Sequence, residues 1–296
     1  MSMAAKAALP QPESLTRDIH LAGGQPTDIL AFATSTGPWS PALQVGAALA
    51  SRWGSLLTGC SIDPSLMALD GAHSEPSVMG LLWETSSQDL ENGDAFRAFA
   101  RQRGVPHASW VAARSGLART LRQLGAWHSL AVLERDMVAP EALVDLLGES
   151  LLTCRLPTLM LPPQWDRPPR FARVLVAWDG SLEATRAIHA ALPLLHDADQ
   201  VILLDGGRHH VEEDGAYSPP FEPFLFLARH HIEARPLYVG LAPRVAGAGL
   251  LEKCAEVRAD LLVMGAFGHS RRRERVLGGA TRHILDHAQL PVFLVH

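Results

Sequence analysis

The stretch RVLVAWDGS, Arg173–Ser181, decides the fold of the C-terminal half of the chain. Its first six residues form a nearly continuous apolar run, which is typical of a strand buried on both faces of a parallel sheet. Ser181 has the side chain of a helix N-cap, and apolar residues at helical spacing follow from Ala184 to Leu195. Pro193 predicts that this helix bends or ends early. A strand, a short polar turn and a helix in this order predict an α/β sheet.

The same alternation continues to the end of the sequence. Apolar runs predict further strands at 201–204, 232–239, 261–264 and 291–295, and helical spacing predicts helices near 221–229, 250–257 and 275–287.

The N-terminal half repeats this order. It predicts strands at 29–34, 56–62, 107–113, 130–133 and 157–161, and helices from Pro41 and near 88–103, 117–124 and 140–153. The two halves also end alike, with CRLPTLML at 154–161 and AQLPVFLV at 288–295. One structural unit used twice is the simplest explanation of this repeat.

These patterns predict an α/β protein of two tandem doubly wound, Rossmann-like domains, each with a five-stranded parallel sheet. A proline-rich stretch around 156–170 separates them. We expect a flexible tail at 1–26, a first domain at 27–162 and a second at 171–296.

Composition excludes several classes of protein. The 296 residues carry 26 Lys+Arg against 31 Asp+Glu, a net charge of −5, which argues against binding nucleic acid through bulk electrostatics. The three cysteines lie far apart, so a disulfide framework is not expected and a reducing compartment fits. No apolar run is long enough to span a membrane, and the N-terminus lacks a signal-peptide pattern. We therefore expect a soluble, cytoplasmic protein.

Ligands of doubly wound sheets bind beyond the carboxyl ends of the strands, so the loops there are the candidate sites. In the second half these loops are Ala177–Ser181 and Met264–Ser270. Gly265, Gly268 and Gly278 are spaced as G-x2-G-x9-G, after a predicted strand and before a predicted helix. Glycines let a backbone approach phosphate closely, and a helix start carries partial positive charge. The alternative is that these glycines only serve tight turns and that the arginines at 271–275 are a solvated arm.

RVLVAWDGS and LLVMGAFGHSRRRERVLGGATRHILDHAQLPVFLV (261–295) resemble the universal stress protein family. That family's first strand ends in Asp-Gly-Ser, and its closing motif is G-x2-G-x9-G followed by Ser or Thr. The resemblance implies a five-stranded sheet of the adenine nucleotide alpha hydrolase-like type, and one branch of the family binds ATP. It implies that Asp179 faces the adenosine, that Gly265 and Gly268 line the ribose and phosphates, and that residues from Gly278 onward hold the phosphates. Tandem copies would mimic the family's usual dimer.

The candidate ligand, by this resemblance, is ATP together with magnesium. The residues expected to bind it are Ala177, Trp178, Asp179, Met264, Gly265, Gly268, His269, Ser270, Gly278, Gly279, Ala280 and Thr281.

Two positions depart from the family pattern. Gly279 stands where Ser or Thr is usual, and Thr281 is the nearest hydroxyl that could replace it. Trp178 precedes Asp179 where a smaller residue is usual, and its indole could stack on an adenine or fill the base pocket.

The first half departs further. Ser35-Thr36-Gly37-Pro38 follows its first strand without an aspartate, and Glu134-Arg135-Asp136 follows its fourth without a glycine. Carboxylates repel a triphosphate, so we expect that this half does not bind nucleotide.

No histidine grouping has the spacing of a metal site, and no side chain can be assigned as a general base, so neither metal nor catalytic residues are expected. These features favour a binding or signalling module of the stress response. The alternatives are a slow ATP hydrolase or nucleotide-dependent transferase using the same loop, and a scaffold that binds no nucleotide. The expected partners are an adenine nucleotide and either the other half of the chain or a second copy.

Overall fold

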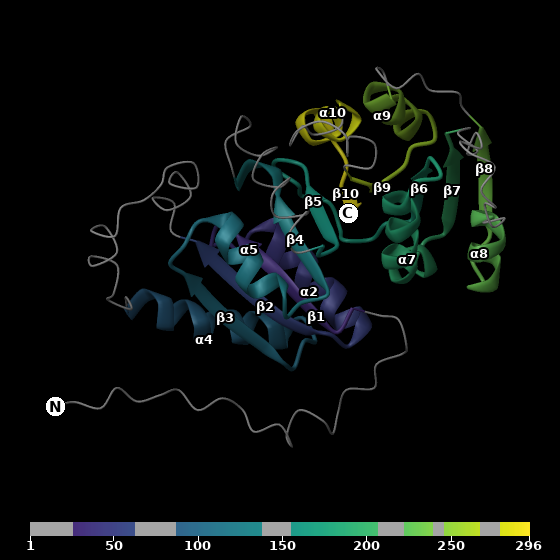
Figure 1. Cartoon of the computed structure of the whole chain (residues 1–296). Coiled ribbons are helices and arrows are strands. Elements are labelled where there is room, and N and C mark those ends of the chain that lie inside the picture. Colours follow the sequence, from purple (N-terminus) through teal and green to yellow (C-terminus); the bar gives the residue numbers. More distant parts are fainter. Residues whose placement is uncertain (1–25, 63–86, 138–154, 207–221, 239–245, 267–278) are drawn as a thin grey trace.

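A computed structural model describes residues 26–62, 87–137, 155–206, 222–238, 246–266 and 279–296 (Figure 1). Ten strands form one sheet in the order β3-β2-β1-β4-β5-β10-β9-β6-β7-β8. The two halves of the sequence therefore form the two halves of a single sheet.

The N-terminal half supplies five mutually parallel strands and the helices between them. The strands are β1 (Asp28–Ala33), β2 (Leu56–Ile62), β3 (Ala108–Ala113), β4 (Leu130–Glu134) and β5 (Thr158–Leu161). The helices are α2 (Pro41–Trp53), α4 (Ser87–Gln102) and α5 (Leu117–Gly125), with a 3-10 turn at Arg135–Met137. The helix expected at 140–153 lies outside the described residues.

The C-terminal half has the same arrangement. Its parallel strands are β6 (Arg173–Trp178), β7 (Gln200–Asp205), β8 (Ala234–Tyr238), β9 (Leu261–Gly265) and β10 (Val292–Val295). Its helices are α7 (Leu182–His196), α8 (Pro223–Arg229), α9 (Ala246–Glu256) and α10 (Gly279–His287). The predicted α/β fold with two five-stranded parallel units is confirmed.

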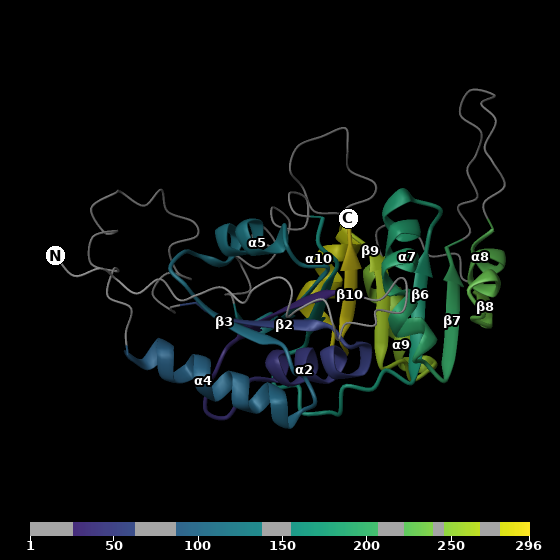
Figure 2. The ribbon, with the colours of Figure 1, turned by 90° about the horizontal axis from the view of Figure 1, so that it is seen from below.

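The two units join edge to edge within one chain (Figures 1 and 2). β5 and β10 pair antiparallel, with Met160 opposite Val292 and Thr158 opposite Leu294. The similar endings of the two halves, LPTLML and LPVFLV, are therefore the two strands at the centre of the sheet. Intramolecular pairing of the halves is confirmed by this ladder.

Two apolar layers cover the two faces of the sheet. One contains residues of α2, α4, α7 and α8, and the other contains residues of α5, α9 and α10. Successive strand residues point to opposite faces, so Ile29 and Ala31 lie in the first layer while Leu30 and Phe32 lie in the second. Both layers run across both halves, so the core is continuous.

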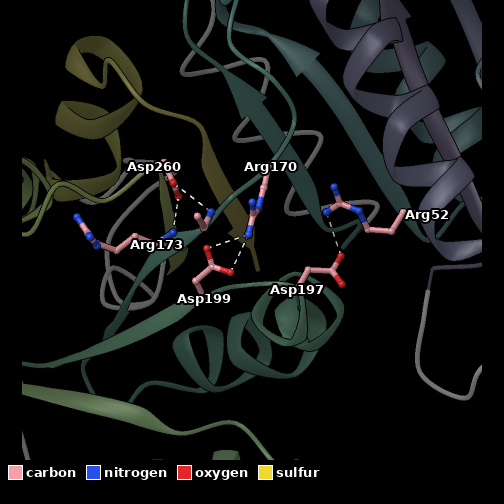
Figure 3. Close-up of polar contacts among 7 residues, drawn as sticks. Arg52, Arg170, Arg173, Asp197, Asp199 and Asp260 are labelled. Carbon is pink, nitrogen blue, oxygen red and sulfur yellow. Dashed lines mark hydrogen bonds and ion pairs between the residues drawn. The ribbon is translucent and has the colours of Figure 1, made fainter.

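Polar contacts fix the chain where it enters the second half (Figure 3). The Arg170 guanidinium lies 2.8 Å from the Asp199 carboxylate, and the Asp260 carboxylate accepts the backbone N–H groups of Ala172 and Arg173 at 3.0 and 2.9 Å. Arg170 and Asp199 are largely exposed, so their ion pair contributes little stability. The backbone bonds to Asp260 define where β6 begins.

A second set of contacts crosses between the halves. Asp197, at the end of α7, accepts a hydrogen bond from Arg52 at 3.2 Å (Figure 3) and another from the Trp53 indole at 3.1 Å. Both donors lie in the last turn of α2. The C-terminal ends of α2 and α7 are thus held together across the centre of the molecule.

The structure confirms Ser181 as the N-cap of α7, because its Oγ accepts the Ala184 N–H at 3.1 Å. The expected early end at Pro193 is wrong, since α7 continues to His196. Pro193, Leu194 and Leu195 are all buried, and this burial outweighs the missing proline N–H.

Candidate functional site

The candidate site lies at the carboxyl ends of β6 and β9, which are adjacent parallel strands. The structure describes eight of the twelve expected residues: Ala177, Trp178, Asp179, Met264, Gly265, Gly279, Ala280 and Thr281. Gly268, His269, Ser270 and Gly278 lie outside the described residues.

Asp179 forms a tight turn between β6 and α7. Its Oδ1 accepts the Ser181 N–H at 3.0 Å, and Gly180 between them has φ +81°, a left-handed conformation that favours glycine. The half-buried carboxylate therefore lies beside the N-terminus of α7, held by the Asp-Gly-Ser sequence itself.

The end of β7 adjoins this turn and was not among the expected site residues. Asp205 pairs with Trp178 in the strand register, and the Gly206 N–H donates to the Trp178 carbonyl at 2.9 Å. A Cβ atom on Gly206 would lie 3.6 Å from the Asp179 Cβ. Asp205 is buried, so it adds a second carboxyl group at this edge. Its place directly after the predicted strand 201–204 is the signal that could have identified it.

Gly265 lies against the first turn of α7. A Cβ atom at this position would meet the backbone N of Ala184 and would lie 2.6 Å from the carbonyl carbon of Glu183. Those are backbone atoms and cannot rotate away. The first glycine of the G-x2-G-x9-G motif therefore has a packing reason, because it lets α7 approach β9.

Trp178 and Met264 project into the core. The Trp178 side chain lies in the layer under α7, where its indole N–H donates to Thr185 Oγ1 at 3.4 Å, and Met264 lies in the opposite layer. Both residues are buried. Ala177 is half-buried and packs against the apolar layer that contains Met264. At this edge of the sheet Trp178 and Met264 can offer a ligand mainly their backbone groups.

The start of α10 packs against α9. A Cβ atom on Gly247 would lie 2.9 Å from the Ala280 carbonyl oxygen, so Ala280 is at the helix contact. Thr281 is buried with an exposed fraction of 4%. A Cβ atom added to Gly279, by contrast, would have no neighbouring atom within 4 Å. Gly279 is thus the residue of this helix start that has open space beside its Cα.

The first half places different groups at the same positions. Leu130 pairs with Ile29 as Leu261 pairs with Val174, so Glu134 is the register equivalent of Gly265 and Thr34 that of Asp179. The carboxyl group thus follows the first strand in the second half, as Asp179, and ends the fourth strand in the first half, as Glu134.

Glu134 caps the helix of its own half. Its Oε1 accepts the Ala42 N–H at 3.1 Å, near the N-terminus of α2, and its Oε2 accepts the Thr34 hydroxyl at 3.1 Å. Burial raises the pKa of Glu134, while these hydrogen bonds oppose the rise. The N-terminus of α2 therefore already holds an internal carboxyl group.

Other chemistry has little support among the described residues. No group of three His, Cys, Asp or Glu side chains there could hold a metal ion. Burial raises the pKa of the Cys60 and Cys254 thiols to about 12, so neither is a nucleophile at neutral pH. In the same part of the chain, no helix is long and apolar enough to cross a membrane.

Comparison with known proteins supports the resemblance in the second half. The model of the universal stress protein family matches residues 226–296. A universal stress protein from Synechocystis sp. is 30% identical over 138 residues, which are 46% of this chain and 45% of that protein. The chain thus matches less than half the length of that relative.

Solved structures share the whole fold. The crystal structure of a universal stress protein from Archaeoglobus fulgidus covers 90% of this chain and 95% of its own, with a TM-score of 0.63 and 16% identity. A functionally unknown protein from Pseudomonas aeruginosa PAO1 covers 91% and 92%, with a TM-score of 0.54 and 14% identity. At such identities the likeness concerns the fold alone.

Proposed function

Because the universal stress protein family model matches residues 226–296, we propose that the C-terminal half binds ATP or a related adenine nucleotide, and that the chain acts as a binding and signalling module in stress adaptation. We place it in the cytoplasm. The nucleotide site would lie at the carboxyl ends of β6 and β9 and at the start of α10.

The observation that carries the proposal is the contrast between Glu134 and Gly265. In the first half a buried carboxyl group stands at the end of β4, the position from which the glycine-rich loop starts in the second half, and its charge would repel a phosphate there. In the second half the equivalent position carries no side chain, and the carboxylate is at Asp179 instead. A repeat that differs at this pair of positions supports a single site, in the second half.

Asp179 suits the nucleoside end of the ligand. A carboxylate only accepts hydrogen bonds, and ribose hydroxyls and the adenine amino group can donate them. The Ser181 N–H fixes the orientation of the Asp179 carboxylate before any ligand binds. Phosphates would instead approach the N–H groups at the start of α10, where the glycine-rich loop ends. Magnesium would arrive with the triphosphate.

The first half supports that helix from its other end. The Arg135 guanidinium donates to the carbonyls of Leu285 and Ala288 at 3.2 and 2.8 Å. These carbonyls belong to the C-terminal end of α10, the negative end of the helix dipole. Arg135 is therefore a positioning residue, since it holds the helix whose N-terminus would face the phosphates.

Binding fits this edge better than turnover. Of the carboxyl groups described there, Asp205 is buried and Asp179 would face the nucleoside end of the ligand, so neither would lie at the phosphates as a general base. A slow ATP hydrolase or transferase remains the second candidate from the sequence, and a scaffold without nucleotide is the third.

The test is thermal unfolding with and without millimolar ATP, in the presence and absence of magnesium. Binding raises Tm, and Asp179→Ala should reduce this rise, while Thr34→Ala, at the equivalent position of the first half, should leave it unchanged. Each rise is referred to the variant's own Tm without ATP, so a change in basal stability does not confuse the result. Gly278→Val should abolish the rise if the loop holds phosphate.

An unchanged Tm of the wild type under all conditions would overturn nucleotide binding and favour the scaffold. If ATP binds, incubation for hours decides between the remaining candidates. Accumulating ADP that is lost in Gly278→Val would favour the hydrolase over the binding module.

A further inference from the structure

A hollow lies at the seam between the two halves, where its residues Val295 and His296 adjoin Gly265 and Ala266 of the candidate nucleotide site. It is an open hollow of about 490 Å³ on the surface, and it is lined by Arg155, Arg186, His189, Ala190, Val295 and His296. Arg186, His189 and Ala190 lie on α7, Val295 and His296 at the end of β10, and Arg155 shortly before β5. The antiparallel pairing of Thr158 with Leu294 brings Arg155 to the end of β10. Cavities of this size commonly hold small molecules.

The side chains around this seam pocket (the six residues above) are cationic or neutral. Arg155 comes from the first half and Arg186 from the second, and none of the six is acidic. Within the described ranges, neither guanidinium has a carboxylate within ion-pair distance, whereas Arg52, Arg97 and Arg170 do. Both guanidinium groups line one pocket and neither is paired with a carboxylate of the described residues, so an anion in the pocket would be attracted by both.

The imidazoles of the seam pocket are held in place. His296 Nδ1 lies 3.1 Å from the Ala266 carbonyl oxygen, so Nδ1 carries the hydrogen and the ring orientation is set. The His189 ring packs on Phe226 with centroids 4.2 Å apart, and burial and the nearby His230 lower the His189 pKa. The pocket side chains that stay charged regardless of pH are those of the two arginines.

Arg155 also adopts an unusual backbone conformation. Its φ is +50°, in the left-handed region that costs a non-glycine residue about 1 kcal/mol. Such conformations cluster at ligand sites, where the strain holds a side chain in a needed direction. Here that direction is toward the pocket that Arg186 also lines.

We propose that the seam pocket binds the phosphate or pyrophosphate group of a small phosphorylated molecule, with Arg155 and Arg186 as its two ligands. Guanidinium groups match phosphate oxygens in paired hydrogen bonds. Ala190 and Val295 give an apolar wall for the rest of the molecule. Because each half supplies one arginine, the site exists only where the two halves are paired. Its two arginines are not among the residues of the nucleotide site proposed above, so the inference does not depend on that site.

The experiment uses the full chain and inorganic pyrophosphate without magnesium, at constant ionic strength. Binding is followed by isothermal titration, and phenylglyoxal modification with mass spectrometry reports the reactivity of each arginine. We expect pyrophosphate to protect Arg155 and Arg186 severalfold and to leave Arg235, an exposed residue of β8, unprotected. The double variant Arg155→Gln/Arg186→Gln should bind at least about tenfold more weakly. Arg235→Gln, with a single charge removed elsewhere, should bind as the wild type does.

Several outcomes would overturn the proposal. They are no binding to the wild type, equal modification of Arg155 and Arg186 with and without pyrophosphate, and unchanged affinity of the double variant. Gly278→Val separates the two sites: if it abolishes pyrophosphate binding while the double arginine variant retains it, the anion binds at the nucleotide site. Failure of ATP to bind would leave the pyrophosphate result untouched. Circular dichroism of each variant verifies its fold.

Discussion

Glu134 and Gly265 occupy the same register position in the two halves of the sheet, and each contacts the first turn of a helix. Glu134 reaches α2 through its side chain, which accepts the Ala42 N–H at 3.1 Å. Gly265 reaches α7 with its backbone, so that even a Cβ atom would collide with Ala184. One half thus fills the space at the helix start with a carboxyl group, and the other closes it by bringing strand and helix together. The repeat has kept its framework and changed the chemistry at this point.

The Glu134 carboxyl group should make stability depend on pH. Burial raises its pKa above the ordinary 4.5, so the folded state holds this proton more tightly than the unfolded state. Its stabilising contribution is then complete below pH 4.5 and is lost as pH rises through the raised pKa. Glu134→Gln keeps an acceptor for Ala42 and removes the titration. The free energy of unfolding of Glu134→Gln, relative to wild type, should therefore increase from pH 4.5 upward and then level off.

Urea unfolding from pH 4 to pH 8 measures this difference. Asp94→Asn is the control, because the Asp94 side chain is 82% exposed and its curve should follow the wild type. Parallel curves for Glu134→Gln and wild type would show that Glu134 does not titrate differently in the folded state.

The packing of Gly265 against α7 predicts a sharp difference between two glycines of the same motif. Gly265→Ala inserts a Cβ into backbone atoms and should cost about 1–3 kcal/mol of unfolding free energy. Gly279→Ala places its Cβ in open space at the start of α10, where alanine is the better helix former by up to about 1 kcal/mol. Urea denaturation of both variants checks this. Equal losses for both would contradict the packing role of Gly265.

The sequence predicted the strands well, because strands buried on both faces are nearly continuous apolar runs. RVLVAW became β6 with its predicted bounds, and 56–62 became β2 likewise. The sequence did not predict to which face of the sheet the side chains at the strand ends point. Trp178 and Ala177 alternate across the sheet, so the indole that the motif placed near a ligand lies under α7.

The sequence also did not predict contacts between residues that are distant along the chain. The N-cap role of Ser181 is local and was predicted, whereas the reason for Gly265 is its contact with a helix that begins 83 residues earlier, at Leu182. Similar endings of the halves were visible in the sequence, but similarity does not tell whether two strands pair. The antiparallel contact of β5 and β10, and with it the seam pocket, needed the structure.

Arg135 should hold the C-terminal end of α10. Arg135→Gln removes a cation that donates to two helix carbonyls, and we expect a loss of about 1–2 kcal/mol. Hydrogen exchange should accelerate in residues 279–288 more than in α7. Arg282→Gln is the matched control: its guanidinium is 63% exposed and 3.9 Å from Asp286, so exchange should change little. Uniformly faster exchange in Arg135→Gln would mean a global loss of stability and not a local anchor.

The Trp178 indole should act as a core residue and not as an adenine platform. Its side chain lies in the layer under α7, and its exposed fraction is 7%. Trp178→Phe leaves a gap in that layer and removes the weak bond to Thr185, so the free energy of unfolding should fall by about 1–3 kcal/mol. Trp127→Phe is the control, because Trp127 is 81% exposed and its replacement should stay within about 0.5 kcal/mol of wild type. The rise in Tm that ATP causes should be the same in Trp178→Phe as in wild type, since stacking on a base requires an accessible ring face. A variant of normal stability with a diminished ATP effect would instead place the indole against the ligand.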